Sequence, residues 1–177
     1  MNKYRIRFQG LVCRAINPLW SFAPDSGEGA ALHGGRFNPV KVPALYTSLD
    51  VHTAWTEAQQ GFPVKTQPLT MVSYEVNCVD LYDLTDPRTM LSLGYEDTHL
   101  SCAWEYDLLM KQIPASWKMS SELISEGICG IIVPSFAKGV QTGAKNIVFW
   151  DWTCELPHKV KVIDDEDRLP KNQISWE

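Results

Sequence analysis

The sequence predicts an α+β fold: one domain (residues 1–177) of mixed, mostly antiparallel sheets flanked by helices. A chain of 177 residues can build one substantial core and is short for two independent domains. Its composition, 45% hydrophobic and 21% charged, is that of an ordinary globular protein. Strand-like and helical segments follow one another without the regular alternation that a doubly wound parallel sheet requires.

The first half of the chain predicts short strands and one helix. Strands are expected over residues 4–8, 10–15 and 43–48, and turn residues and glycines predict a long loop over residues 17–38. Asp50 is a candidate N-cap for a helix over residues 51–60, with an apolar face made by Val51, Ala54, Trp55 and Ala58. The Gly-Phe-Pro sequence at residues 61–63 is expected to end this helix.

The second half of the chain mixes strands with helices. Residues 69–76 alternate apolar with polar side chains and predict the clearest strand. Helical patterns cover residues 98–112 and 120–126, the second closing at Gly127. Further strands are expected over residues 128–133 and 146–152, with a short one after Lys159.

Charge and cysteine usage exclude several classes of protein. The net charge of −5 argues against a general nucleic-acid binder, which needs clustered Lys and Arg. No stretch approaches the roughly 20 apolar residues of a membrane span, and the N-terminus lacks the apolar core of a signal peptide, so we expect a cytoplasmic protein. Reduced, mostly buried thiols are expected for the five scattered cysteines, Cys13, Cys78, Cys102, Cys129 and Cys154. No metal site is expected, because the histidines have no ligand spacing.

The first candidate for chemistry is the sequence Gly34-Gly35-Arg36. Paired glycines allow a close backbone approach to a ligand, and the guanidinium of Arg36 matches a phosphate. A tight turn with a solvated arginine explains the same residues. Neither a GxGxxG nor a GxxxxGK[ST] motif is present, so the Rossmann and P-loop modes of nucleotide binding are unsupported.

Glu57 is the second candidate, at the border of the apolar face of the predicted helix. A fixed carboxylate can stabilise the positive charge that develops on ribose when a glycosidic bond breaks. A solvated helical glutamate is the alternative.

Four other residues could complete a site. Tyr46 could stack on a heterocycle or bind phosphate or ribose, or lie in the core. Arg14, set among apolar neighbours, needs an anionic partner, either a ligand or a glutamate. Ser135 lacks the spacing of a nucleophile and fits a hydrogen-bonding role, while His33 could contact a ligand or be structural.

Taken in order, these motifs resemble the RES domain, named for its Arg, Glu and Ser, which forms the toxin in bacterial Xre–RES toxin–antitoxin pairs. The matching segments are residues 4–6, 14–15, 26–30, 34–39, 43–48, 53–57 and 133–135. The resemblance implies a fold like that of ADP-ribosyltransferase toxins. Arg14, Glu57 and Ser135 would then be the family's catalytic residues, with Arg36, Tyr46 and His33 binding substrate. Residues 67–127 carry no recognisable motif.

The resemblance further implies a growth-arresting toxin that depletes NAD by cleaving the nicotinamide–ribose bond, as a glycohydrolase or a phosphorylase. NAD would be substrate rather than cofactor, with phosphate as an optional co-substrate. An Xre-type helix-turn-helix antitoxin would be the partner, and a homodimer is left open. The alternatives are a mono-ADP-ribosyltransferase acting on a protein and a non-catalytic nucleotide-binding module.

Overall fold

The computed structural model describes residues 3–60 and 66–174, an α+β arrangement with six strands in the order β1-β2-β5-β4-β3-β6. Because β1 also pairs with β3, the pairings of β1, β2, β5, β4 and β3 close a ring, and β6 lies outside it on β3. The strands are β1 (Arg5–Ile16), β2 (Leu45–Ser48), β3 (Thr70–Asp83), β4 (Gly130–Pro134), β5 (Lys145–Phe149) and β6 (His158–Val162). Only the β3–β4 pair is parallel among these described strands, which confirms a mostly antiparallel sheet.

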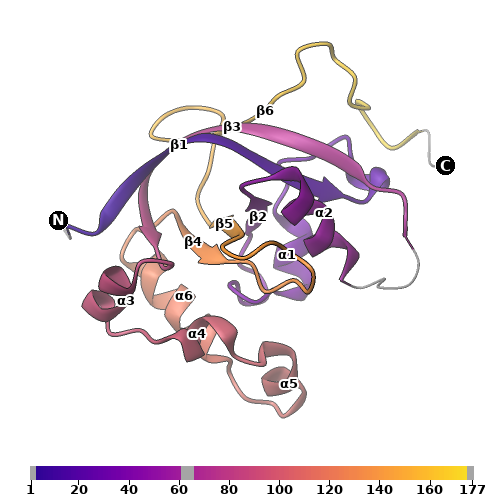
Figure 1. Ribbon diagram of the computed structural model, residues 1–177. Helices are drawn as coiled ribbons and strands as arrows, with labels where there is room; N and C mark the ends of the chain where they lie inside the picture. Colours follow the sequence, from indigo (N-terminus) through magenta and orange to yellow (C-terminus); the bar gives the residue numbers. More distant parts are fainter. Residues whose placement is uncertain (1–2, 61–65, 175–177) are drawn as a thin grey trace.

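Helices lie at two places around the strands (Figure 1). Near β2 are α1 and α2, whereas α3 to α6 gather beside the end of β3 and β4. Their bounds are η1 (Pro18–Trp20, a 3-10 turn), α1 (Glu28–His33), α2 (Val51–Gln59), α3 (Pro87–Leu93), α4 (Asp97–Ser101), α5 (Trp104–Leu109) and α6 (Ala115–Ser125). In the described part of the chain, no helix has both the length and the apolar character needed to cross a bilayer.

The predicted strands exist, but several have different bounds, among them the strand predicted over residues 146–152, which ends at Phe149. Residues 4–8 and 10–15 form one continuous strand, β1, and the irregularity is a bulge between Ile6 and Phe8 rather than a break at Gly10. The strand predicted over residues 69–76 extends to Asp83, and near its end the adjacent side chains of Leu81 and Tyr82 are both buried. Such double burial removes the alternation that marks a strand in a sequence.

The predicted helices of the second half were partly wrong. Residues 98–112 form two short helices, α4 and α5, since the chain is extended at Cys102 (φ −54°, ψ 148°). The next helix begins at Ala115, directly after Pro114, and not at residue 120. Helix α3 was missed, although Asp86 caps it and Pro87 occupies its first turn, a usual start signal.

Helix α2 begins as predicted, with the Asp50 carboxylate accepting from the Thr53 backbone N–H at 2.8 Å. The residues predicted to end it, 61–63, lie outside the described part of the chain. Its predicted apolar face was wrong in part: Ala54 is buried as expected, but Val51 and Trp55 are 53% and 40% exposed and Thr53 is buried. Thr53 tolerates burial because its hydroxyl donates to Asp50 at 2.6 Å.

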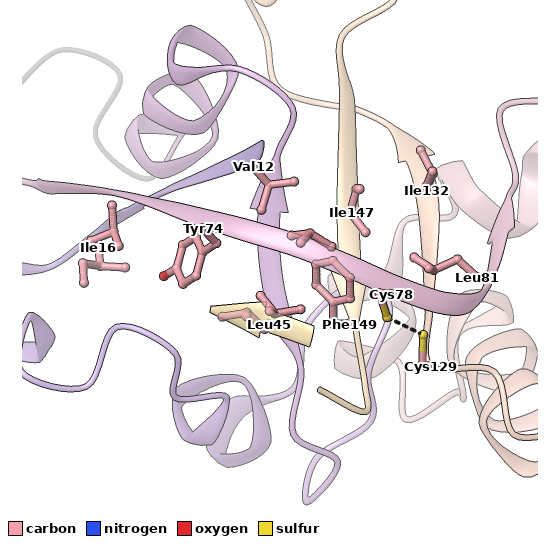
Figure 2. Close-up of a cluster of buried hydrophobic side chains, with 13 residues drawn as sticks. Val12, Ile16, Leu45, Tyr74, Cys78, Leu81, Cys129, Ile132, Ile147 and Phe149 are labelled. Carbon is pink, nitrogen blue, oxygen red and sulfur yellow. Dashed lines mark hydrogen bonds between the residues drawn. The ribbon is translucent and has the colours of Figure 1, made fainter. Parts of the chain in front are cut away.

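The core inside the ring of strands is drawn in Figure 2. It contains residues from every strand of the ring, including Val12, Leu45, Tyr74, Ile132 and Phe149. Cys78 and Cys129 meet there with their sulfur atoms 3.0 Å apart. Three of the five cysteines, Cys13, Cys78 and Cys129, are buried free thiols, which agrees with the prediction.

Candidate active site

The Gly-Gly-Arg sequence lies in a tight loop that the rest of the protein holds in place. Gly34 ends α1 with φ 71°, in the left-handed region that favours glycine. The Gly35 N–H donates to the Asn38 carbonyl at 3.0 Å, and its own carbonyl accepts from the Trp117 indole at 2.7 Å. An added Cβ at Gly35 would lie 2.5 Å from the Tyr46 hydroxyl, so only glycine fits.

Tyr46 supports this loop through its hydroxyl. The hydroxyl donates to Asn38 Oδ1 at 2.7 Å and accepts from the Phe37 backbone N–H at 3.0 Å. Burial raises the pKa of Tyr46 above its ordinary range, against a smaller lowering by the Phe37 N–H and Arg36. Because the hydroxyl is engaged within the protein, the aromatic ring is the part that Tyr46 can offer to a ligand.

Arg36 projects from this loop beside Phe136, with its guanidinium carbon 4.7 Å from the ring centroid. Its Nη1 donates to the Cys102 carbonyl at 2.7 Å and to the Leu100 carbonyl at 3.4 Å. In the described part of the chain, no carboxylate pairs with Arg36 within 4.0 Å. The guanidinium is therefore oriented without being neutralised.

Glu57 points from α2 toward the ends of β4 and β5, where two side chains bind its carboxylate. The Ser135 hydroxyl donates to Glu57 Oε1 at 2.6 Å, and the Asn146 amide donates to the same oxygen at 2.5 Å. Gln60 donates to Oε2 at 2.5 Å. Three donors fix the orientation of the carboxylate.

Asn146 was missed as a site residue by sequence reasoning, which assigned it only to the start of a strand. Its carbonyl oxygen accepts from the Ser48 hydroxyl at 2.7 Å, so its amide nitrogen is turned toward Glu57. The available signal was a polar residue at the start of an apolar strand, next to a turn. The network joins α2, β2, β4 and β5, elements brought together only by the tertiary fold.

Arg14, on β1, does not have the carboxylate partner that its apolar neighbours led us to consider. Its Nη1 donates to the carbonyls of Pro24 and Ser26, both at 3.1 Å, and no described carboxylate lies within 4.0 Å. The buried Tyr74 hydroxyl donates to the same Pro24 carbonyl at 2.6 Å, and burial raises the pKa of Tyr74 to about 12. Arg14 is thus a second oriented cation without a counter-charge.

Two adjoining pockets share Tyr46, Glu57 and Asn146 as a common wall. The first has a volume of about 280 Å³ and includes Arg14. The second has a volume of about 310 Å³ and includes Arg36. We call the two together the cleft. Glu57 lines both pockets, the first together with Arg14 and the second together with Arg36.

His33 is the predicted site residue that lies elsewhere. It lines a separate pocket of about 350 Å³ that touches the cleft only through Arg14 and Ala15. The structure therefore brings Arg14, Arg36, Tyr46, Glu57 and Ser135 together around the cleft and leaves His33 outside it. Within the described residues, no group of three His, Cys, Asp or Glu side chains is arranged to hold a metal ion.

The fold and this cleft define an α+β protein with a ligand site centred on the Glu57 carboxylate and two arginines, and Glu105 also lines the pocket that contains Arg36. Comparison with protein families identifies the family of this protein. The RES domain model matches residues 11–172, and the chain belongs to that family. Among solved structures, the chain is similar to one described as the crystal structure of the M. tuberculosis MbcT–MbcA toxin–antitoxin complex. That similarity has a TM-score of 0.61 at 18% identity and covers 90% of this chain and 84% of the other. Curated protein sequences give no significant match.

Proposed function

We propose that this protein is the toxin of a toxin–antitoxin pair, a single-domain cytoplasmic enzyme that cleaves the nicotinamide–ribose bond of NAD and so arrests growth. Membership of the RES family and similarity to a chain from a toxin–antitoxin complex support the toxin role. A helix-turn-helix protein of the Xre type is the proposed antitoxin, and a homodimer is compatible with the proposal. The likeness to ADP-ribosyltransferases in fold stays a prediction.

The observation that carries the proposal is the geometry at Glu57. Its carboxylate is held by Ser135 and Asn146 in a cleft that also presents Arg14 and Arg36. A dinucleotide carries two phosphates and a ribose whose anomeric carbon becomes cationic as nicotinamide leaves. An oriented carboxylate among phosphate-binding cations matches that distribution of charge.

Each residue then has a defined part in the reaction. The two arginines bind the pyrophosphate, and the Tyr46 ring packs beside the nicotinamide riboside. Glu57 stabilises the developing cation while Ser135 and Asn146 hold its carboxylate in position. The bond from C1′ to the pyridinium nitrogen breaks with both electrons leaving on nicotinamide, and water or phosphate forms the new bond to C1′. A proton is released when water is the acceptor.

Incubation of the purified protein with NAD, with and without phosphate, tests the proposal when the products are identified by mass. Nicotinamide with ADP-ribose indicates hydrolysis, and nicotinamide with ADP-ribose 1″-phosphate indicates phosphorolysis. Label from adenine-labelled NAD that becomes fixed on a protein would instead support the mono-ADP-ribosyltransferase alternative. Intact NAD under both conditions, with the protein folded by circular dichroism, would overturn the proposal and leave the non-catalytic nucleotide-binding alternative.

The matched variant is Glu57→Gln, which keeps the shape of the side chain and removes its charge. We expect kcat to fall by about 10²–10³-fold or more, as when a transition-state charge loses its stabilising partner. Glu155→Gln is the control, since Glu155 is an exposed glutamate that lines no part of the cleft. Equal activity of the two variants would refute the role assigned to Glu57.

A further inference from the structure

The pocket that contains His33 is not used by the reaction proposed at Glu57. It is about 350 Å³ in volume and adjoins the cleft at Arg14 and Ala15, which line both. One side comes from the segment that follows β1, including Trp20, and another from α1, including Leu32. A ligand group in this pocket would therefore be separated from Glu57 by Arg14.

Trp20 gives this pocket an aromatic surface that the fold does not cover. The side chain is 51% exposed, although large aromatic residues are usually well buried. Its backbone lies in a 3-10 turn that the Asn17 side chain caps by accepting from the Leu19 N–H at 3.0 Å, and its ring lies 6.1 Å from that of Phe22. A half-exposed indole in a concave site suits a flat heterocycle.

The other lining residues fit a nucleoside. Leu32, 69% exposed, adds apolar surface from α1. Asn17 and Glu28 supply polar side chains that can bind ribose hydroxyls or an exocyclic amino group. The pocket thus combines apolar surface with a few polar groups, as small-molecule sites do.

The order of the pockets matches the order of groups in a dinucleotide. The reacting ribose belongs at Glu57, a phosphate at Arg14, and whatever lies beyond the phosphates falls beside Trp20. We propose that the Trp20 pocket binds the adenosine half of NAD, with the adenine ring stacked on the indole of Trp20. This inference rests on the proposed function, and it makes Trp20 a residue that determines specificity rather than one that takes part in bond cleavage.

The test compares two substrates that share the reactive bond, NAD and nicotinamide mononucleotide, of which the second lacks the adenosine monophosphate half. Trp20→Ala should lower kcat/KM for NAD by about tenfold or more, through KM, and leave kcat/KM for nicotinamide mononucleotide unchanged. Trp20→Phe should recover most of the loss, because phenylalanine can still stack. Tyr106→Ala is the control: Tyr106 is 61% exposed and lies in none of the three pockets.

Titration calorimetry with adenosine monophosphate separates this inference from the proposed function. Wild-type protein should bind adenosine monophosphate about tenfold more tightly than Trp20→Ala does. If NAD is not cleaved but this difference in binding is found, the adenosine pocket stands and the proposed reaction fails. If NAD is cleaved and Trp20→Ala changes neither kcat/KM nor binding, or weakens both substrates equally, the adenosine pocket is refuted.

Discussion

Replacing Gly35 by alanine should destabilise the protein by about 2–4 kcal/mol while leaving its backbone conformation allowed. The added Cβ would lie 2.5 Å from the Tyr46 hydroxyl and 2.7 Å from Asn38 Oδ1, both far inside ordinary contact. Relief requires the Tyr46 hydroxyl to move, which breaks its hydrogen bonds to Asn38 and to the Phe37 N–H. Each buried group left unsatisfied costs about 1–3 kcal/mol.

Thermal and urea denaturation measure this loss directly. For a domain of this size the expected fall in Tm is about 5–15 °C, at about 2–4 °C per kcal/mol. Gly29→Ala is the matched control, because a Cβ at Gly29 meets no atom within 4 Å and Gly29 lies in α1 with an ordinary φ. It should change the free energy of unfolding by less than about 0.5 kcal/mol, or stabilise the protein slightly.

A double-mutant cycle with Tyr46→Phe tests the cause. Removing the hydroxyl removes the closest clash, so Gly35→Ala should cost at least about 1 kcal/mol less in the Tyr46→Phe protein than in wild type. Full stability of Gly35→Ala, or the same cost in both backgrounds, would show that the loop is not held as described.

Two further predictions concern the support of Glu57. Asp50→Ala should lower the free energy of unfolding by about 1 kcal/mol, since Asp50 caps α2. Hydrogen bonds from the Thr53 hydroxyl and backbone hold the pKa of Asp50 below its ordinary value, so in urea titrations this difference should be constant above about pH 5 and vanish as the pH falls through that lower pKa. A difference that grew toward acid pH would contradict this. Asn146→Ala should lower kcat for NAD about tenfold or more with little change in KM, since the Glu57 carboxylate loses one of the three donors that position it; a rise in KM alone would instead assign Asn146 to substrate binding.

Local signals were sufficient for much of the fold. The N-cap at Asp50, the alternation over residues 69–76 and the β-branched run before Pro134 each predicted an element that the structure contains. The predictions that failed concern features that depend on tertiary contacts. The apolar character of Val51 and Trp55 placed them on the buried face of α2, whereas Thr53 is buried there because Asp50 satisfies its hydroxyl.

The candidate site, like the fold, could be predicted from local sequence signals only in part. Glu57 and Ser135 are 78 positions apart, and ordered motifs suggested that they share a site, but no local pattern gives their 2.6 Å hydrogen bond. Asn146 was missed because its importance comes from lying between Ser48 and Glu57 after β5 pairs with β2. Arg14 was expected to need an anionic partner, either a ligand or a glutamate; no described carboxylate pairs with it, two backbone carbonyls orient it, and the ligand alternative stays a prediction.

The hydrogen bonds of the glycine loop also bear on when a newly made chain can become active. Gly35 is held by Trp117 and Phe37 by Trp150, partners 82 and 113 positions later in the sequence. During synthesis the loop cannot take its final form until the residues up to Trp150 have left the ribosome and β5 has paired with β2. The cleft is therefore a late product of translation, completed only after Trp150 has been made and has joined the fold.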